Sequence, residues 1–138
     1  EDGRRSDPIV KAAGKTRSLI IRAAESVALR KMVVDATQNN NQPVLLFGDL
    51  NDDLPAVTTE IIAGDEPYRF AKPEDKKIEW DRLLYSVHDL EEQESYRNVS
   101  YTHIFSGRYE LLDHIFVSQE FFHRNPASIA IVRSTRIF

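Results

Sequence analysis

The chain contains no cysteine, and that absence excludes several kinds of chemistry at once. Without cysteine there is no disulfide framework, no thiolate nucleophile and no cysteine-rich structural zinc site. The sequence also lacks an excess of basic residues, because its formal net charge is −4. Long nucleic acid would therefore have to be held by a local basic patch or by metal ions, and nonspecific binding to duplex DNA is disfavoured.

Long apolar runs are missing too. No stretch approaches the length of a membrane span, and the first residues do not resemble a signal peptide, so the sequence leaves the cellular compartment undefined. A chain of 138 residues with 41% hydrophobic and 29% charged residues fits one compact domain with a real core. Because the sequence does not begin with methionine, we expect it to be cut from something longer.

The most informative segment lies between Pro43 and Asp53. A short apolar run ends in Gly48, and Asp49, Asn51 and two further carboxylates follow it. The run predicts a strand covered on both faces, and Gly48 permits the turn that brings the polar side chains out of it. If the backbone stays extended, Asp49 and Asn51 point the same way, and such a pair suits a phosphate and a hard cation.

These acidic residues have two alternative interpretations besides a phosphate and cation site. For Asp52 and Asp53 a turn is favoured, in which Asp53 caps a helix over 56–63 that Gly64 ends. A calcium-binding loop is the more specific alternative, because four residues occupy positions 1, 3, 5 and 12 of the EF-hand pattern: Asp49, Asn51, Asp53 and Glu60. The EF-hand match fails because Leu54 stands where the loop needs glycine and a β-type run precedes it.

Apolar residues at helical spacing predict two helices. The first begins near Thr16, after a polar loop over residues 1–15, and ends near Asn39; its stripe consists of Ile20, Ala24, Val27, Ala28 and Met32. On the same reasoning Arg22, Ser26 and Arg30 occupy another face of this helix. A second helical stripe, expected to pack in the core, consists of Trp80, Leu83, Leu84 and Val87.

The region between residues 100 and 118 predicts a β-hairpin, with Ser106-Gly107 in its loop. Asp113 lies in an otherwise apolar strand, so a buried carboxylate there would need a cation, a histidine or backbone donors as its partner. His114 should point to the opposite face and not pair with it. The remaining histidines lack metal-site spacing, and residues 128–134 predict a last strand.

Two motifs in a fixed order carry a resemblance. The run Val44 to Asp52, followed 64 residues after Asp49 by the run Leu112 to Ser118, resembles the endonuclease/exonuclease/phosphatase superfamily, also called DNase I-like. The helix containing residues 22–30 is similar to the helix that precedes the Gly-Asp-Leu-Asn strand in bacterial members. The resemblance covers nearly the whole chain.

The resemblance implies an α/β (α+β) fold, namely half of a two-sheet sandwich with a mixed, mostly antiparallel sheet and covering helices. It implies hydrolysis of phosphate esters with Mg²⁺ or Mn²⁺, by attack of water on phosphorus. By motif, Asp49 corresponds to the aspartate that orients or activates the water, and Asn51 to the amide that holds a phosphate oxygen. Asp113 corresponds to the aspartate that orients a histidine near the C-terminus and keeps its imidazole protonated. Asp49 and Asn51 could also hold a secondary metal.

Departures from the family pattern limit this expectation. The Asn and Glu of the family's primary metal site, a catalytic His ahead of the first helix and the closing Ser-Asp-His segment have no counterpart here. We therefore expect residues 1–138 to form a single, incomplete domain, the C-terminal portion, which is inactive alone. Such a half-sandwich leaves one apolar sheet face open, which a second copy could cover as a homodimer.

The expected function is thus a metal-dependent nuclease, phosphodiesterase or phosphatase. Its substrate is a phosphate ester, with a short nucleic acid among the candidates. The alternative is a non-catalytic binding or structural module on the same fold.

Overall fold

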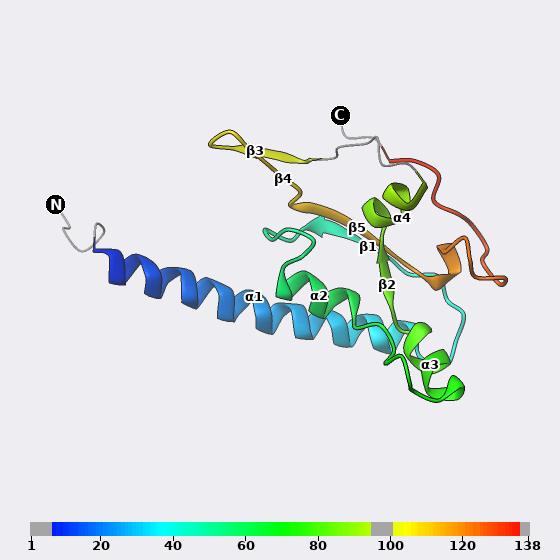
Figure 1. The fold of residues 1–138 in the computed structure, drawn as a ribbon. Coiled ribbons are helices and arrows are strands. Elements are labelled where there is room, and N and C mark those ends of the chain that lie inside the picture. Colours follow the sequence, from blue (N-terminus) through cyan, green and yellow to red (C-terminus); the bar gives the residue numbers. More distant parts are fainter. Residues whose placement is uncertain (1–6, 95–100, 136–138) are drawn as a thin grey trace.

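The computed structural model describes residues 7–94 and 101–135, which form an α+β fold of helices and small antiparallel sheets (Figure 1). In chain order the elements are α1 (Pro8–Thr37), β1 (Leu45–Asp49), α2 (Val57–Ala63), α3 (Pro73–Trp80), β2 (Leu84–Ser86), α4 (Val87–Glu94), β3 (His103–Phe105), β4 (Arg108–Glu110), β5 (Asp113–Ser118) and the 3₁₀ turn η2 (Gln119–Phe121). One sheet has the order β1-β5-β2, and β3 pairs with β4. All of these pairings are antiparallel.

Helix α1 begins earlier than the sequence predicted. The carboxylate of Asp7 accepts a hydrogen bond from the N–H of Ile9 at 2.8 Å, and Pro8 occupies the first helical position. An acceptor before the helix followed by proline is a strong helix start, because it satisfies a free N–H and presets the backbone. The prediction of a loop up to Lys15 is therefore wrong for residues 8–15, and residues 1–6 lie outside the described part of the chain.

The face of α1 that packs on the body is also not the predicted one. Ser26, Val33 and Thr37 are its buried residues, whereas the predicted apolar stripe is exposed, with Ile20 at 64% and Val27 at 58%. The hydroxyl of Thr37 is satisfied because it donates to the carbonyl of Val33. The packed side of α1 thus combines the polar residues Ser26 and Thr37 with the apolar Val33 and the partly buried Leu29, which lie against α2 and the sheet.

Arg30, on the buried side of α1, joins three parts of the fold. Its Nη1 donates to the carbonyls of Ile62 and Ala63 at the end of α2, and to the carbonyl of Arg82 before β2. Burial lowers the pKa of this guanidinium, and the charge of Asp65 partly opposes that shift. The carbonyls at the end of α2 are thereby satisfied by a charged donor.

One face of the three-stranded sheet is covered by α1 and α2. Its core is formed by buried apolar side chains with half-buried neighbours around them: Val33, Ile62, Leu84 and Phe116. On the other face, a smaller cluster under α4 is formed by Val87, Leu90 and Val117. The rest of that second face is open, with Leu45 53%, Phe47 72% and Ile115 40% exposed. Strand β1 is therefore covered on one face only, which corrects the prediction of cover on both.

The second predicted helical stripe does not form one helix, although most of its residues are buried as predicted. Leu83, Leu84 and Val87 are each 4% exposed, as core residues should be, yet Leu84 lies in β2, while Trp80 ends α3 and is 37% exposed. Leu84 forms part of the ladder with β5, opposite Ser118. A short apolar run does not distinguish strand from helix, and pairing with β5 decided the outcome.

The predicted hairpin is present but shorter. Ser106 and Gly107, with φ of 49° and 77°, form the two-residue turn between β3 and β4, which needs positive φ at both positions. The chain then leaves this hairpin, and from Asp113 it pairs with β1 and β2 instead. Ser100 lies outside the described residues.

The last predicted strand, over 128–134, is absent from the described part of the chain. Instead, the N–H groups of Ile129 and Ala130 both donate to the carbonyl of Glu120, and Ile129 is 66% exposed. An alternating apolar pattern forms a strand only where a neighbouring strand edge can pair with it.

Candidate functional site

Asp49 and Asp113 lie directly opposite each other on neighbouring strands. The register of β1 and β5 pairs Leu45 with Val117, and this pairing ends with Asp49 opposite Asp113. Partners in an antiparallel ladder project from the same face of the sheet, so both carboxylates lie on the open face, beside Phe47 and Ile115. The two residues that the sequence placed 64 positions apart are thus neighbours.

Asn51 is connected to Asp49 by a turn. Its N–H donates to Oδ1 of Asp49 at 2.8 Å, and its φ of 54° lies in the left-handed region that Asn tolerates. The extended backbone that the sequence reasoning assumed is therefore absent at this position. Asn51 stays next to Asp49 because of this local hydrogen bond, not because of strand alternation.

Asp113 is exposed, which corrects the expectation of a buried carboxylate. Its backbone is fixed, however, because the hydroxyl of Thr102 accepts hydrogen bonds from the N–H groups of Leu112 and Asp113, at 3.0 and 3.1 Å. The ladder also continues past the strand ends, with the N–H of Leu50 donating to the carbonyl of Leu112. Hydrogen bonds therefore hold the backbone at both aspartates.

His114 points away from these carboxylates, as predicted. It is 3% exposed on the helix-covered face, and its Nε2 lies 2.7 Å from the carbonyl oxygen of Asp52. This contact connects β5 to the loop after β1. His114 therefore acts as a packing and hydrogen-bonding residue and cannot serve as the imidazole partner of Asp113.

Asp52 and Asp53 have structural roles, although not the predicted one. The carboxylate of Asp52 accepts two hydrogen bonds from Arg22, at 2.9 and 3.1 Å, and a third from the hydroxyl of Thr58. The helix cap is Ala56 without a side-chain bond, so the predicted capping by the Asp53 side chain is wrong. It is the carbonyl of Asp53 that accepts from Ala56 and from Thr59. Gly64 does end α2, as expected.

A small cavity of about 200 Å³ lies where β1, α1 and α2 meet. Asp49 and Asn51 border it together with Arg22, Ser26 and Thr58. The oxygen donors of Asp49, Asn51 and Asp113 fit a hard cation in kind. There are too few ligands for a metal site, because within residues 7–94 and 101–135 no three His, Cys, Asp or Glu side chains converge on one point. Further ligands would be needed to complete a primary metal site.

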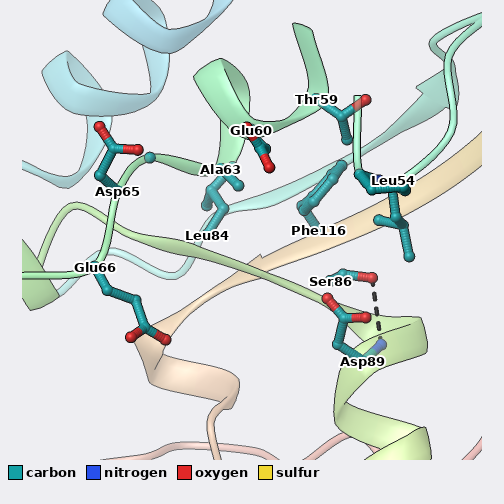
Figure 2. Close-up of a pocket in the computed structure, with 12 residues that line it drawn as sticks. Leu54, Thr59, Glu60, Ala63, Asp65, Glu66, Leu84, Ser86, Asp89 and Phe116 are labelled. Atoms are coloured by element: carbon teal, nitrogen blue, oxygen red, sulfur yellow. Dashed lines mark hydrogen bonds between the residues drawn. The ribbon is translucent and has the colours of Figure 1, made fainter. Parts of the chain in front are cut away.

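A larger cavity of about 550 Å³ also lies on the helix-covered side, and Thr59 borders both cavities (Figure 2). Its floor is apolar, with Leu84 and Phe116, and four carboxylates surround it: Glu60, Asp65, Glu66 and Asp89. Ser86 accepts a hydrogen bond from the N–H of Asp89. Burial raises the pKa of Asp89, and the charge of His88 partly opposes that shift. Such an acidic lining repels phosphate esters.

The sequence reasoning missed this cavity, because its acidic residues are scattered over α2, the following loop and α4. Glu60 borders this cavity, whereas Asp49 borders the smaller one, and no three His, Cys, Asp or Glu side chains of the described residues converge on one point. The four positions of the calcium-loop pattern are therefore not gathered around one cation.

The fold and site together define an α+β domain that carries two opposed carboxylates at one end of an antiparallel sheet. Comparison of the chain with known protein families, with curated proteins and with solved structures finds no match. Among the described residues, no helix combines the length and apolar character that crossing a membrane requires.

Proposed function

We propose that this chain contributes part of the active site of a Mg²⁺- or Mn²⁺-dependent phosphate-ester hydrolase of the endonuclease/exonuclease/phosphatase type. The observation that carries the proposal is the placement of Asp113 directly opposite Asp49, with Asn51 hydrogen-bonded to Asp49. Like charges opposite each other in a ladder are destabilising. A cation bound between the two carboxylates would offset this repulsion.

Asp49 and Asn51 each have a defined task in this proposal. Asp49 accepts or steers a proton of the attacking water, and the amide of Asn51 donates to a phosphate oxygen as charge develops on it. Asp113 supplies the second carboxylate. A bound divalent cation would neutralise the charge that develops on the phosphate oxygens.

A non-catalytic module on the same fold is the second candidate, and one observation favours it. Oδ1 of Asp49 is already used by the turn to Asn51, and the described residues supply no third ionisable ligand nearby. On this alternative Asp49 and Asn51 only shape a loop, as Asp and Asn commonly do.

Hydrolysis of bis(4-nitrophenyl) phosphate by the full-length gene product, with and without Mg²⁺ or Mn²⁺, tests the proposal. Asp49→Asn and Asp113→Asn should each lower the metal-dependent rate by about a hundredfold or more. Asp75→Asn, an exposed acid on α3, is the matched control and should leave the rate unchanged. Full activity of Asp49→Asn would refute its assigned role. A wild-type protein without any metal-dependent turnover would support the binding module.

A further inference from the structure

Thr102 joins the hairpin of β3 and β4 to the first residues of β5. Its N–H donates to the carbonyl of Glu110 at 3.0 Å. Its hydroxyl oxygen accepts hydrogen bonds from the N–H groups of Leu112 and Asp113, at 3.0 and 3.1 Å. One residue just before β3 is therefore bonded to the segment in which the chain leaves the hairpin and enters the three-stranded sheet (Figure 1).

The peptide unit between Leu112 and Asp113 is held on both sides. Its carbonyl accepts from the N–H of Leu50 at 2.9 Å, and its N–H donates to Thr102. Leu50 directly follows Asp49, so this one peptide unit connects the hairpin to the end of β1. Because both of its polar groups have partners, its position depends on Thr102 as well as on β1.

The strands next to β5 do not supply the bond that Thr102 makes. The bond between Leu50 and Leu112 makes Asp49 and Asp113 a non-hydrogen-bonded pair, so the N–H of Asp113 points away from β1. On the other side, within the described residues, β2 pairs with β5 only at positions 116–118. The hydroxyl of Thr102 thus takes the place of a neighbouring strand at Asp113.

The same pair of residues carries a repulsion that favours separation. In a non-hydrogen-bonded pair the two Cα atoms lie about 4.5 Å apart and the side chains are close, so the carboxylates of Asp49 and Asp113 repel each other. Asp49 is the last residue of β1 and Asp113 the first of β5, and the end of a ladder opens more readily than its middle. The bonds to Thr102 restrict how far the start of β5 can move in response.

We infer that Thr102 is a positioning residue, which holds Asp113 so that its carboxylate stays opposite that of Asp49 in the reaction proposed above. The inference rests on that proposed function, which assigns the two carboxylates to one site. Thr102 acts only through Asp113 and touches no reacting atom. Its own position is supported by the ring of Tyr101, which packs on Tyr109 across the hairpin with ring centroids 4.6 Å apart. Groups that are held in place before the substrate binds need no rearrangement during the reaction.

Turnover of bis(4-nitrophenyl) phosphate by the full-length gene product tests the inference with two variants of one residue. Thr102→Val removes the acceptor but keeps a β-branched side chain, and Thr102→Ser keeps the hydroxyl. Thr102→Val should lower kcat about tenfold with little change in KM, because a displaced carboxylate weakens interactions made in the transition state. Thr102→Ser should retain most of the rate.

A double-mutant cycle tests whether Thr102 acts through Asp113. In an Asp113→Asn background, whose rate is already lowered, Thr102→Val should cause less than about a twofold further loss, because the carboxylate that Thr102 positions is gone. An equal loss in both backgrounds would identify a general structural effect and overturn the inference.

Hydrogen exchange in metal-free buffer gives a readout that does not depend on turnover. Thr102→Val should speed the exchange of the amides of Leu112 and Asp113, and Thr102→Ser should not, because only the first variant lacks the acceptor. Thr16→Val is the matched control, since the exposed hydroxyl of Thr16 donates to the carbonyl of Ala12 at 3.0 Å within the first half of α1. This control should change neither the rate nor the exchange of these amides.

The outcomes separate this inference from the proposed function. A wild-type protein without metal-dependent turnover would refute the proposed function, and the positioning role would be refuted with it. Metal-dependent turnover that Thr102→Val leaves unchanged would overturn the positioning role alone. So would unchanged exchange of the Asp113 amide in Thr102→Val.

Discussion

Replacing Gly64 by alanine should destabilise the protein more than any ordinary glycine substitution. Gly64 ends α2 with φ of 87° and ψ of 157°, a conformation that is almost restricted to glycine. A Cβ at this position would overlap Nη2 of Arg30 and lie 2.6 Å from its Cζ. The change therefore strains the backbone and also displaces the guanidinium.

The magnitude follows from those two effects. Holding a residue with a Cβ in this region of φ and ψ costs about 1–3 kcal/mol. Displacing the guanidinium of Arg30 weakens its hydrogen bonds to the carbonyls of Ile62, Ala63 and Arg82, each worth about 0.5–1.5 kcal/mol net. Because Arg30 is only half-buried, water replaces part of that loss, so we expect a total of about 3 kcal/mol.

Urea unfolding followed by circular dichroism measures this cost. With a slope of about 1.5 kcal/mol per M, the midpoint should fall by roughly 2 M. In an Arg30→Leu background, Gly64→Ala should cost only the backbone part, because no guanidinium is left to displace. The reasoning is refuted if Gly64→Ala leaves the midpoint unchanged, or if its cost is the same in both backgrounds.

Two further predictions concern charge. Asp113→Asn removes the repulsion with Asp49 and should raise the free energy of unfolding by a few tenths to about 1 kcal/mol in a metal-free buffer; a loss of stability measured by urea titration would contradict this. Burial raises the pKa of Tyr85, which stacks on Phe122, to about 12. Since the folded state then favours the neutral phenol, stability is unaffected below about pH 10 and falls between about pH 10 and 12. Tyr85→Phe should abolish this extra fall, and a spectroscopic titration of Tyr85 near pH 10 would disprove it.

The predicted site could be read from the sequence only in part. The alternation of side chains correctly placed His114 and Asp113 on opposite faces of a strand. It failed at Asn51, where a hydrogen bond to Asp49 turns the backbone into the left-handed region. Local bonds of this kind override periodicity and are not visible in a hydrophobic pattern.

The buried face of α1 could not be predicted from its own sequence. Exposed Ile20 and buried Ser26 on α1 reverse the predicted face, because that face was chosen from apolar content alone. What packs against α1 is α2, and the bonds from Arg30 fix how the two helices meet. Partners distant in the sequence thus decided which side of the helix is inside.

By itself the sequence determined the local features: the strand before Asp49, the end of α2 at Gly64, and the Ser106-Gly107 turn. Each depends on the backbone preferences of a few adjacent residues. Only the tertiary structure decided that Asp113 leaves the hairpin and lies opposite Asp49, since strand register is set by contacts between segments far apart in the chain. The physical reason is that strand pairing and packing determine which residues lie next to a carboxylate. The hydrophobic pattern of one strand does not show which other strand will pair with it.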